Sequence, residues 1–114
     1  MTLSTETVTP RSWGEGCLTW ELISRGDLAV FHEWMPPGTT EVTHGHRRAR
    51  QFFFVLEGEL RIESMGREHA LRRHQGLEIP PGEVHKVRNV SGLPAEFLAI
   101  AHPSTAGDRI VGEG

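Results

Sequence analysis

Apolar and polar residues alternate along much of this chain with a period of two, which is typical of β-strands that bury one face. In residues 17–23, Leu18 and Trp20 lie on one face while Thr19 and Glu21 lie on the other. Turn-forming residues interrupt the pattern about every ten positions, and no segment has the 3.6-residue period of a helix. The pattern therefore predicts an all-β fold.

The same reasoning predicts further strands at residues 28–35, 51–56, 60–63, 68–71, 77–79, 85–89 and 97–102. Residues 1–12 are expected to form a tail that is either flexible or paired at a sheet edge, and residues 103–114 a second tail. A chain of 114 residues that is 37% hydrophobic suits one compact domain. Its core is expected to extend from about residue 17 to 102.

Residues 51–56 are apolar on both faces, because Phe53 and Val55 alternate with Phe52 and Phe54. A strand of this kind must be covered on both sides. Phe53 and Val55 are expected to line the interior and to shape the wall of a pocket. A second sheet or a second copy of the chain must then cover the other face, which favours a homodimer.

Two histidines, His44 and His46, are separated by one residue, so both imidazoles leave the same face of an extended strand. Gln51 follows His46 by five residues, and an odd spacing cannot place it on that face of one unbroken strand. A turn or bulge within residues 47–50 must change the phase if the three side chains are to converge.

A third histidine, His85, follows the turn at residues 80–82 and is expected to be the first inward residue of the next strand. Three imidazoles and an amide oxygen are suitable ligands for a divalent transition metal (Zn, Fe, Mn, Ni or Cu). The predicted metal ligands are therefore His44, His46, Gln51 and His85. Gln51 could instead hydrogen-bond a ligand or a water molecule.

The spacing around the first two histidines follows a known order: Gly, five residues, His-x-His, three or four residues, Glu, six residues, Gly. Gly38, His44, His46 and Gly58 fit it, and Gln51 occupies the position of the glutamate.

A second known order reads Gly, five residues, Pro-x-Gly, two residues, His, three residues, Asn. Pro80, Gly82, His85 and Asn89 fit it, while His74 stands where the opening glycine would fall. These two patterns resemble the motifs of the cupin family, and the resemblance covers about residues 18–102. It implies a single cupin-type β-barrel, also called a double-stranded β-helix or jelly roll.

The family includes dioxygenases, isomerases, decarboxylases, cyclases and binding modules, so the fold alone does not select a function. One expectation is a metal-dependent dioxygenase, and another is a zinc-dependent Lewis-acid isomerase or cyclase. The glutamine-bearing ligand set resembles that of cupin-type aromatase/cyclases of polyketide pathways, which favours the second. The alternative is a non-catalytic small-molecule-binding or sensor cupin that uses the metal to hold its ligand.

Four neutral ligands would leave the double positive charge of the ion uncompensated. Such a site should favour an anionic or enolate-like molecule, and an apolar wall suits an aromatic or otherwise hydrophobic one. The expected substrate is therefore a small enolisable or oxygen-rich molecule that could be aromatic. Arg50 is a candidate for holding a substrate carboxylate, although an exposed loop arginine is the simpler interpretation. Glu33 and a metal-bound water are the candidates for the general base.

The composition argues against several classes of binding partner. The net charge is −3 and the pI is about 6.1, so a nucleic-acid-binding surface is not expected. Cys17 is the only cysteine, which suits a reducing cytosol, and no apolar run approaches the length of a membrane span. The sequence therefore predicts a cytoplasmic protein whose partner is a small molecule.

Overall fold

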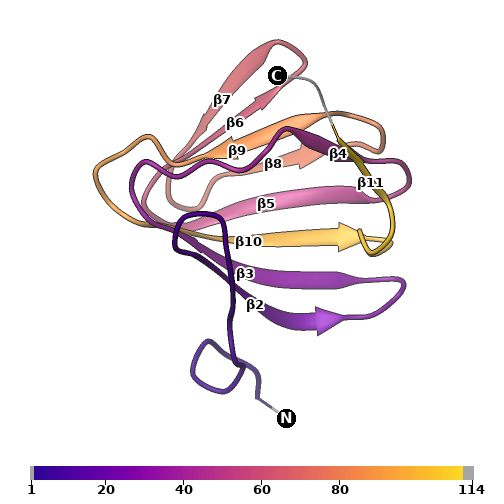
Figure 1. Ribbon diagram of the computed structural model, residues 1–114, viewed down its shortest axis with the longest axis horizontal. Helices are drawn as coiled ribbons and strands as arrows, with labels where there is room; N and C mark the ends of the chain where they lie inside the picture. Colours follow the sequence, from indigo (N-terminus) through magenta and orange to yellow (C-terminus); the bar gives the residue numbers. More distant parts are fainter. Residues whose placement is uncertain (1, 112–114) are drawn as a thin grey trace.

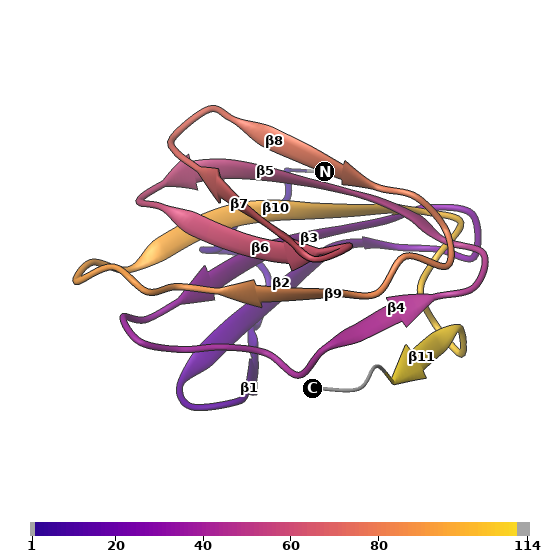
Figure 2. The same cartoon turned by 90° about the horizontal axis from the view of Figure 1, so that it is seen from above.

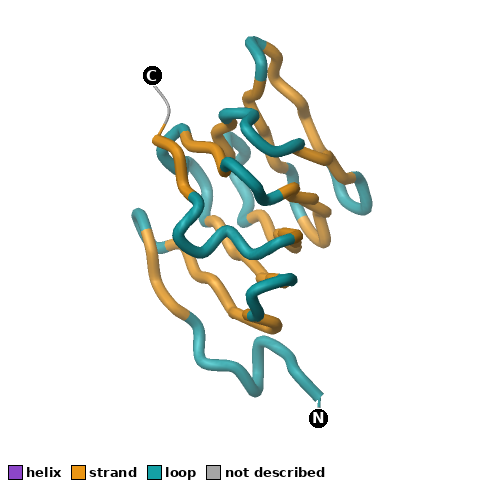
Figure 3. The backbone as a smooth tube through the Cα atoms, turned by 90° about the vertical axis from the view of Figure 1, so that its right-hand side faces the viewer, coloured by secondary structure: helices purple, strands orange, loops and turns teal. Residues whose placement is uncertain are grey.

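The computed structural model describes residues 2–111 and contains only β-strands, turns and loops in that range (Figure 3). The eleven strands are β1 (Arg11–Trp13), β2 (Cys17–Ser24), β3 (Ala29–Met35), β4 (His44–His46), β5 (Arg50–Glu57), β6 (Leu60–Ser64), β7 (Arg67–Leu71), β8 (Gly76–Ile79), β9 (His85–Arg88), β10 (Ala95–His102) and β11 (Arg109–Val111). The predicted all-β fold is confirmed. No helix in the described part is long and apolar enough to cross a membrane.

The strands form two antiparallel sheets that face each other (Figures 1 and 2). The six-stranded sheet has the order β1-β2-β3-β10-β5-β8, and the five-stranded sheet has the order β11-β4-β9-β6-β7. Strands far apart in the sequence are neighbours, since β10 lies between β3 and β5, and β4 pairs with β9. This crossing of the chain between two sheets makes a double-stranded β-helix.

The inward residues form two apolar clusters. The larger one includes Met35, Val55 and Leu60, none of which is exposed to solvent, and each such side chain contributes about 1.5–3 kcal/mol by burial. The smaller one contains three buried alanines with Phe31 packed against them. Phe31 and, from the larger cluster, Phe53 both border the pocket described below.

Both predicted tails contain a strand. At the N-terminus, β1 pairs with the outer edge of β2. Residues 11 and 12 of the predicted tail therefore follow the edge-paired alternative. At the C-terminus, β11 pairs with β4, so the prediction of a tail at 103–114 is wrong for residues 109–111. A three-residue strand is too short to produce a detectable alternation. Met1 and residues 112–114 lie outside the described residues.

The outer face of the six-stranded sheet carries a row of large, mostly apolar side chains, as the two-sided pattern of β5 predicted. Trp20, His32, Leu98 and Phe54 follow one another across four adjacent strands. Phe52 is 39% exposed, and its ring stacks on that of Phe54 with centroids 6.1 Å apart. His32 in this row pairs with Glu96 at 3.1 Å, and the prediction of this row as a dimer face is developed under the proposed function.

His74, which departs from the second motif, lies in a surface turn. Its φ of +66° is in the left-handed region that favours glycine, which explains why the motif has glycine there. The backbone N–H of His74 donates to the carbonyl of Val55 at 2.8 Å, and its ring stacks on Phe54 with an interplanar angle of 8°. The substitution therefore alters an outer turn and leaves the interior unchanged.

Candidate functional site

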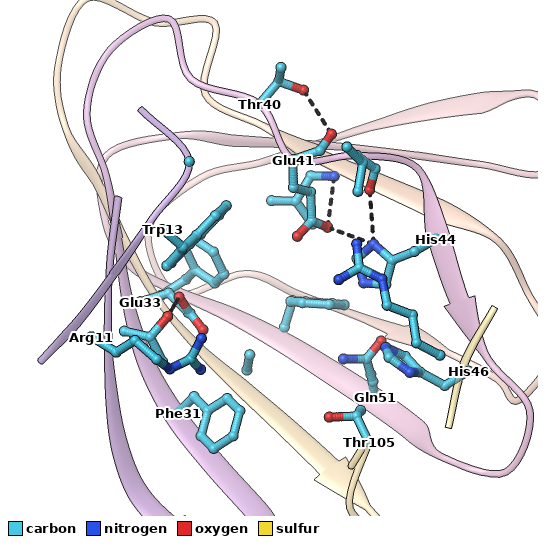
Figure 4. Close-up of a pocket in the computed structure, with 18 residues that line it drawn as sticks. Arg11, Trp13, Phe31, Glu33, Thr40, Glu41, His44, His46, Gln51 and Thr105 are labelled. Atoms are coloured by element: carbon cyan, nitrogen blue, oxygen red, sulfur yellow. Dashed lines mark hydrogen bonds and ion pairs between the residues drawn. The ribbon is translucent and has the colours of Figure 1, made fainter. Parts of the chain in front are cut away.

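A pocket of about 430 Å³ opens between the two sheets (Figure 4). Its walls come from strands of both sheets and from the two terminal segments that were expected to be tails. The N-terminal segment supplies Arg11 and Trp13, and the C-terminal segment supplies Thr105 and Arg109. The pocket is therefore closed by parts of the chain at opposite ends of the sequence.

Strand pairing brings the three predicted histidines together, with His44 and His46 on the pocket wall and His85 buried beside them. His44 of β4 is the register partner of His85 of β9. The ring centroids are 4.7 Å apart for His44 and His85, 5.1 Å for His44 and His46, and 6.3 Å for His46 and His85. All three residues are buried, with exposed fractions of 8%, 7% and 1%.

Backbone carbonyls orient two of these rings. Nδ1–H of His44 donates to the carbonyl of Val42 at 2.9 Å, and Nδ1–H of His85 donates to that of Glu83 at 3.2 Å. A proton on Nδ1 leaves the lone pair of Nε2 free, and this second hydrogen bond is typical of metal-ligating histidines. Nε2 of His85 is buried and has no hydrogen-bond partner among the described residues.

Gln51 reaches the same region because the chain turns sharply after β4. Figure 4 shows its amide beside the His46 ring. Gln51 Oε1 and His46 Nδ1 are both buried and without a hydrogen-bond partner in the described part of the chain. Buried polar atoms in proteins normally have a partner, so two such atoms at one pocket indicate that something else satisfies them. Whether both ligate the same ion as His44 and His85 stays a prediction.

Glu41 is a functional candidate that the sequence did not reveal. The ligand atoms of Glu41, His44 and His85 all lie within 4.8 Å of one another, so this trio could hold a metal ion. Glu41 Oε1 accepts the backbone N–H of Val87 at 3.2 Å and lies 3.8 Å from His44 Nδ1. Glu41 precedes β4 in a loop, where strand alternation gives no information about direction. Its carboxyl modifies the expectation of an entirely neutral site.

Burial governs the protonation of this cluster. It lowers the pKa of His44 and His46, and it lowers that of His85 to about 4. The neutral imidazole, which is the form that binds metals, therefore dominates at neutral pH. Burial also raises the pKa of Glu41 to about 8.

Glu33 lies on another wall of the pocket, away from the histidines (Figure 4). Its carboxylate accepts a hydrogen bond from the Thr19 hydroxyl at 2.5 Å. Glu33 is 8% exposed, and burial raises its pKa to about 7, partly opposed by that hydrogen bond. A carboxyl group of this kind can gain or lose a proton near neutral pH.

The predicted substrate-binding residues are only partly in place. Phe53 lines the pocket. Val55 is fully buried in the larger apolar cluster and does not line the pocket. The part of β5 that forms the pocket wall is its beginning, with Gln51 and Phe53. Arg50 is exposed and pairs with Glu78 at 3.2 Å on the outer face. The arginines that do line the pocket are Arg11 and Arg109.

The donor set fits a divalent transition metal. Two imidazoles have their Nδ1 atoms engaged by carbonyls, and buried nitrogen and oxygen atoms of the cluster lack partners within residues 2–111. Nitrogen ligands together with a carboxylate or amide oxygen suit zinc, iron, nickel or copper. The residues available to hold such an ion are His44, His46, Gln51 and His85, with Glu41 beside them.

Residues 31–101 match the family model described as Cupin domain. The chain belongs to the cupin family. Over 64 residues it is 39% identical to Polyketide synthase CurC from Streptomyces cyaneus, covering 56% of this chain and 42% of the relative. The chain spans about half the length of the curated relatives it matches.

Two solved structures show the same fold. The polyketide cyclase RemF from Streptomyces resistomycificus has a TM-score of 0.84 at 18% identity, covering 100% of this cupin and 87% of that chain. A predicted oxalate decarboxylase from Thermotoga maritima has a TM-score of 0.84 at 19% identity, covering 91% and 100%. At these identities the two structures support the fold alone.

Proposed function

We propose that this cupin is a metal-dependent enzyme that acts as an isomerase or cyclase on a small, enolisable, oxygen-rich aromatic molecule. The observation that carries the proposal is one pocket in which side chains that could hold a metal ion and a buried carboxyl group, Glu33, occupy different walls. Such a pairing provides one group to polarise an oxygen and another to move a proton.

The pocket wall suits a flat aromatic ligand. Phe31, Phe53 and Phe97 line it, and its volume of about 430 Å³ is within the range of small-molecule sites. Two similar proteins, Polyketide synthase CurC and the polyketide cyclase RemF, are named for polyketide chemistry, which favours the cyclase alternative. Arg11 and Arg109 at the pocket favour a ligand with anionic oxygens.

The protein residues would divide the work as follows. A divalent ion bound by the histidine cluster would supply Lewis acidity to a carbonyl or enolate oxygen. Glu33 in its ionised form would accept a proton from an activated carbon or hydroxyl and later return it. The phenylalanines would hold the ring system and keep water away from Glu33, and Arg109 would orient an anionic group.

Metal analysis of protein purified without a metal-chelating tag, combined with assays on aromatic poly-β-ketone analogues, tests the proposal. A bound divalent metal with rearrangement of the analogue and no oxygen uptake is the expected result. Substrate-dependent oxygen consumption would replace the proposal by a dioxygenase. Tight binding without turnover would replace it by a non-catalytic binding cupin.

Gln51→Glu tests the charge argument. We expect this variant to retain the metal but to bind aromatic carboxylates about tenfold more weakly, because one more negative charge would lie next to the ion. Isothermal titration with the same acids measures the change, and the neutral methyl esters are the control ligands. Equal affinity of both proteins for the acids would contradict the argument.

We also propose that the apolar row on the outer face of the six-stranded sheet pairs with a second copy of the chain. Phe52→Asp should produce monomers at concentrations where the wild type is dimeric, since two carboxylates would enter an apolar interface. Sedimentation equilibrium measures the association. Val90→Asp, which alters an apolar side chain that is 54% exposed elsewhere on the surface, is the matched control. A wild type that remains monomeric would refute the dimer.

A further inference from the structure

One buried carboxylate outside the pocket holds the turn between β4 and β5. Asp108 is 4% exposed and lies just before β11. Its carboxylate accepts three backbone N–H groups, from Arg47 at 3.0 Å, Arg48 at 2.9 Å and Ala49 at 2.9 Å. The N–H of Arg47 also approaches the Asp108 carbonyl at 3.2 Å. A single side chain therefore satisfies every backbone donor of this turn.

This turn determines whether Gln51 can join the histidines. His46 and Gln51 are five residues apart, so on an uninterrupted strand their side chains would point to opposite faces. In the structure both lie at the pocket, because the three residues 47–49 leave the strand and change the phase. The position of Gln51 relative to His46 thus depends on the shape of three consecutive peptides.

The same C-terminal segment also pairs with the histidine strand. Arg109 is the register partner of His46, and Val111 is the partner of His44. Asp108 is itself held by its backbone N–H, which donates to the carbonyl of Thr105 at 3.1 Å. The carboxylate is consequently fixed relative to β4 on one side and to the turn on the other.

We infer that Asp108 is a positioning residue for the metal centre, acting through the turn at residues 47–49 to place Gln51 beside His46. The inference rests on the metal site of the proposed function. It goes beyond that site in assigning a role to a residue that contacts neither the ion nor the ligand. Mutation of groups that hydrogen-bond directly to metal ligands typically lowers metal affinity 10- to 100-fold, and Asp108, which acts one step further out, is expected at the lower end of this range.

A merely stabilising role would predict something different. Loss of Asp108 would then lower the melting temperature and weaken metal binding equally whether or not Gln51 is present. If Asp108 acts through Gln51, the two substitutions must be non-additive, because removing the side chain of Gln51 removes what Asp108 positions. A double-mutant cycle in metal affinity separates the two cases.

The experiment titrates Co²⁺ into metal-free wild type, Asp108→Asn, Gln51→Ala and the double variant, and follows the visible absorption of the bound ion. We expect each single variant to bind about tenfold more weakly, with a changed Co²⁺ spectrum, and the double variant to bind no more weakly than Gln51→Ala. Leu71→Ala, a core substitution on β7, is the control that lowers stability without changing the spectrum. Asp108→Glu, whose carboxylate is displaced by one methylene, replaces Asp108→Asn if that protein does not fold.

Additive losses, or a spectrum of Asp108→Asn identical to that of the wild type, would overturn the inference while leaving the metal site intact. If wild-type protein binds no Co²⁺, both the proposed metal site and the inference fail. The two failures are therefore distinguishable in a single set of titrations.

Discussion

Replacing His85 with alanine is expected to weaken binding of a divalent transition metal by about 100-fold or more. His85 is 1% exposed, and its Nε2 atom is buried without a hydrogen-bond partner among the described residues. It belongs to the predicted set with His46 and Gln51, and also to the compact trio with Glu41 and His44. Whichever oxygen completes the coordination, loss of His85 therefore removes a ligand.

The measurement is a competition titration of Zn²⁺ against a chromophoric chelator, using protein freed of metal beforehand. Zn²⁺ should also raise the melting temperature of the wild type and not that of His85→Ala, because only a bound ion stabilises the folded state. His69→Ala is the matched control, since His69 lies on β7 and is not part of the cluster that could hold a metal ion. Wild-type affinity in His85→Ala would show that the cluster is not the metal site.

The histidines of this site could be predicted from the sequence because each lies in a recognisable local pattern, and the resemblance to the two cupin motifs joined the distant segments. A spacing of two places His44 and His46 on one face of any extended strand. His85 follows a Pro-Pro-Gly turn that defines where its strand begins. The need for a phase change before Gln51 was likewise readable from an odd spacing, and the turn at residues 47–49 confirms it.

The remaining parts of the site depend on contacts that no local pattern encodes. Glu41 lies in a loop, and it approaches His44 because its carboxylate accepts the backbone N–H of Val87 from another strand. Arg11 and Arg109 lie in segments with weak alternation, and they reach the pocket only through pairing at the sheet edges. Asp108 had no signal at all, because the groups it satisfies are backbone amides about 60 residues earlier, as their separations of 59 to 61 residues show.

Val55 and Arg50 show that a residue can fit a local pattern and still lie away from the pocket. Alternation placed Val55 correctly on the inner face of β5, but it does not report depth, and Val55 lies in the packed core. Arg50 is adjacent in sequence to a site residue, Gln51, yet the strand period directs it outward to Glu78. Proximity along the chain was therefore a poor guide to proximity in the pocket.

Glu33→Gln is expected to make the metal-free protein more stable at pH 8 while leaving its stability at pH 4 nearly unchanged. Burial raises the pKa of Glu33 to about 7 from an ordinary value of 4.5. The folded protein therefore binds this proton more tightly than the unfolded chain does. The stabilisation is fully present below about pH 4.5 and is lost as the pH rises through 7.

The expected size of the effect is on the order of 3 kcal/mol at pH 8, since each pKa unit corresponds to about 1.4 kcal/mol. Glutamine keeps an oxygen that can accept the Thr19 hydroxyl and removes the charge. Urea denaturation from pH 4 to pH 8 measures the difference. Arg11 and Glu21 carry charges that affect the pKa of Glu33, and the charge of Glu33 in turn affects the pKa of Cys17 and of Glu41. Glu59→Gln, which changes an exposed acid between β5 and β6, is the matched control and should show no such pH dependence.

Activity should change in the opposite direction. If Glu33 transfers the proton, Glu33→Gln should lower turnover by about 100-fold or more without changing Zn²⁺ affinity, and wild-type turnover should rise with pH to a plateau above about 7. A variant that is more stable and less active would identify a carboxyl group retained at a cost to folding because the chemistry requires it. A variant that is more stable and fully active would assign proton transfer to another group, leaving Glu33 as a buried acid with no catalytic role.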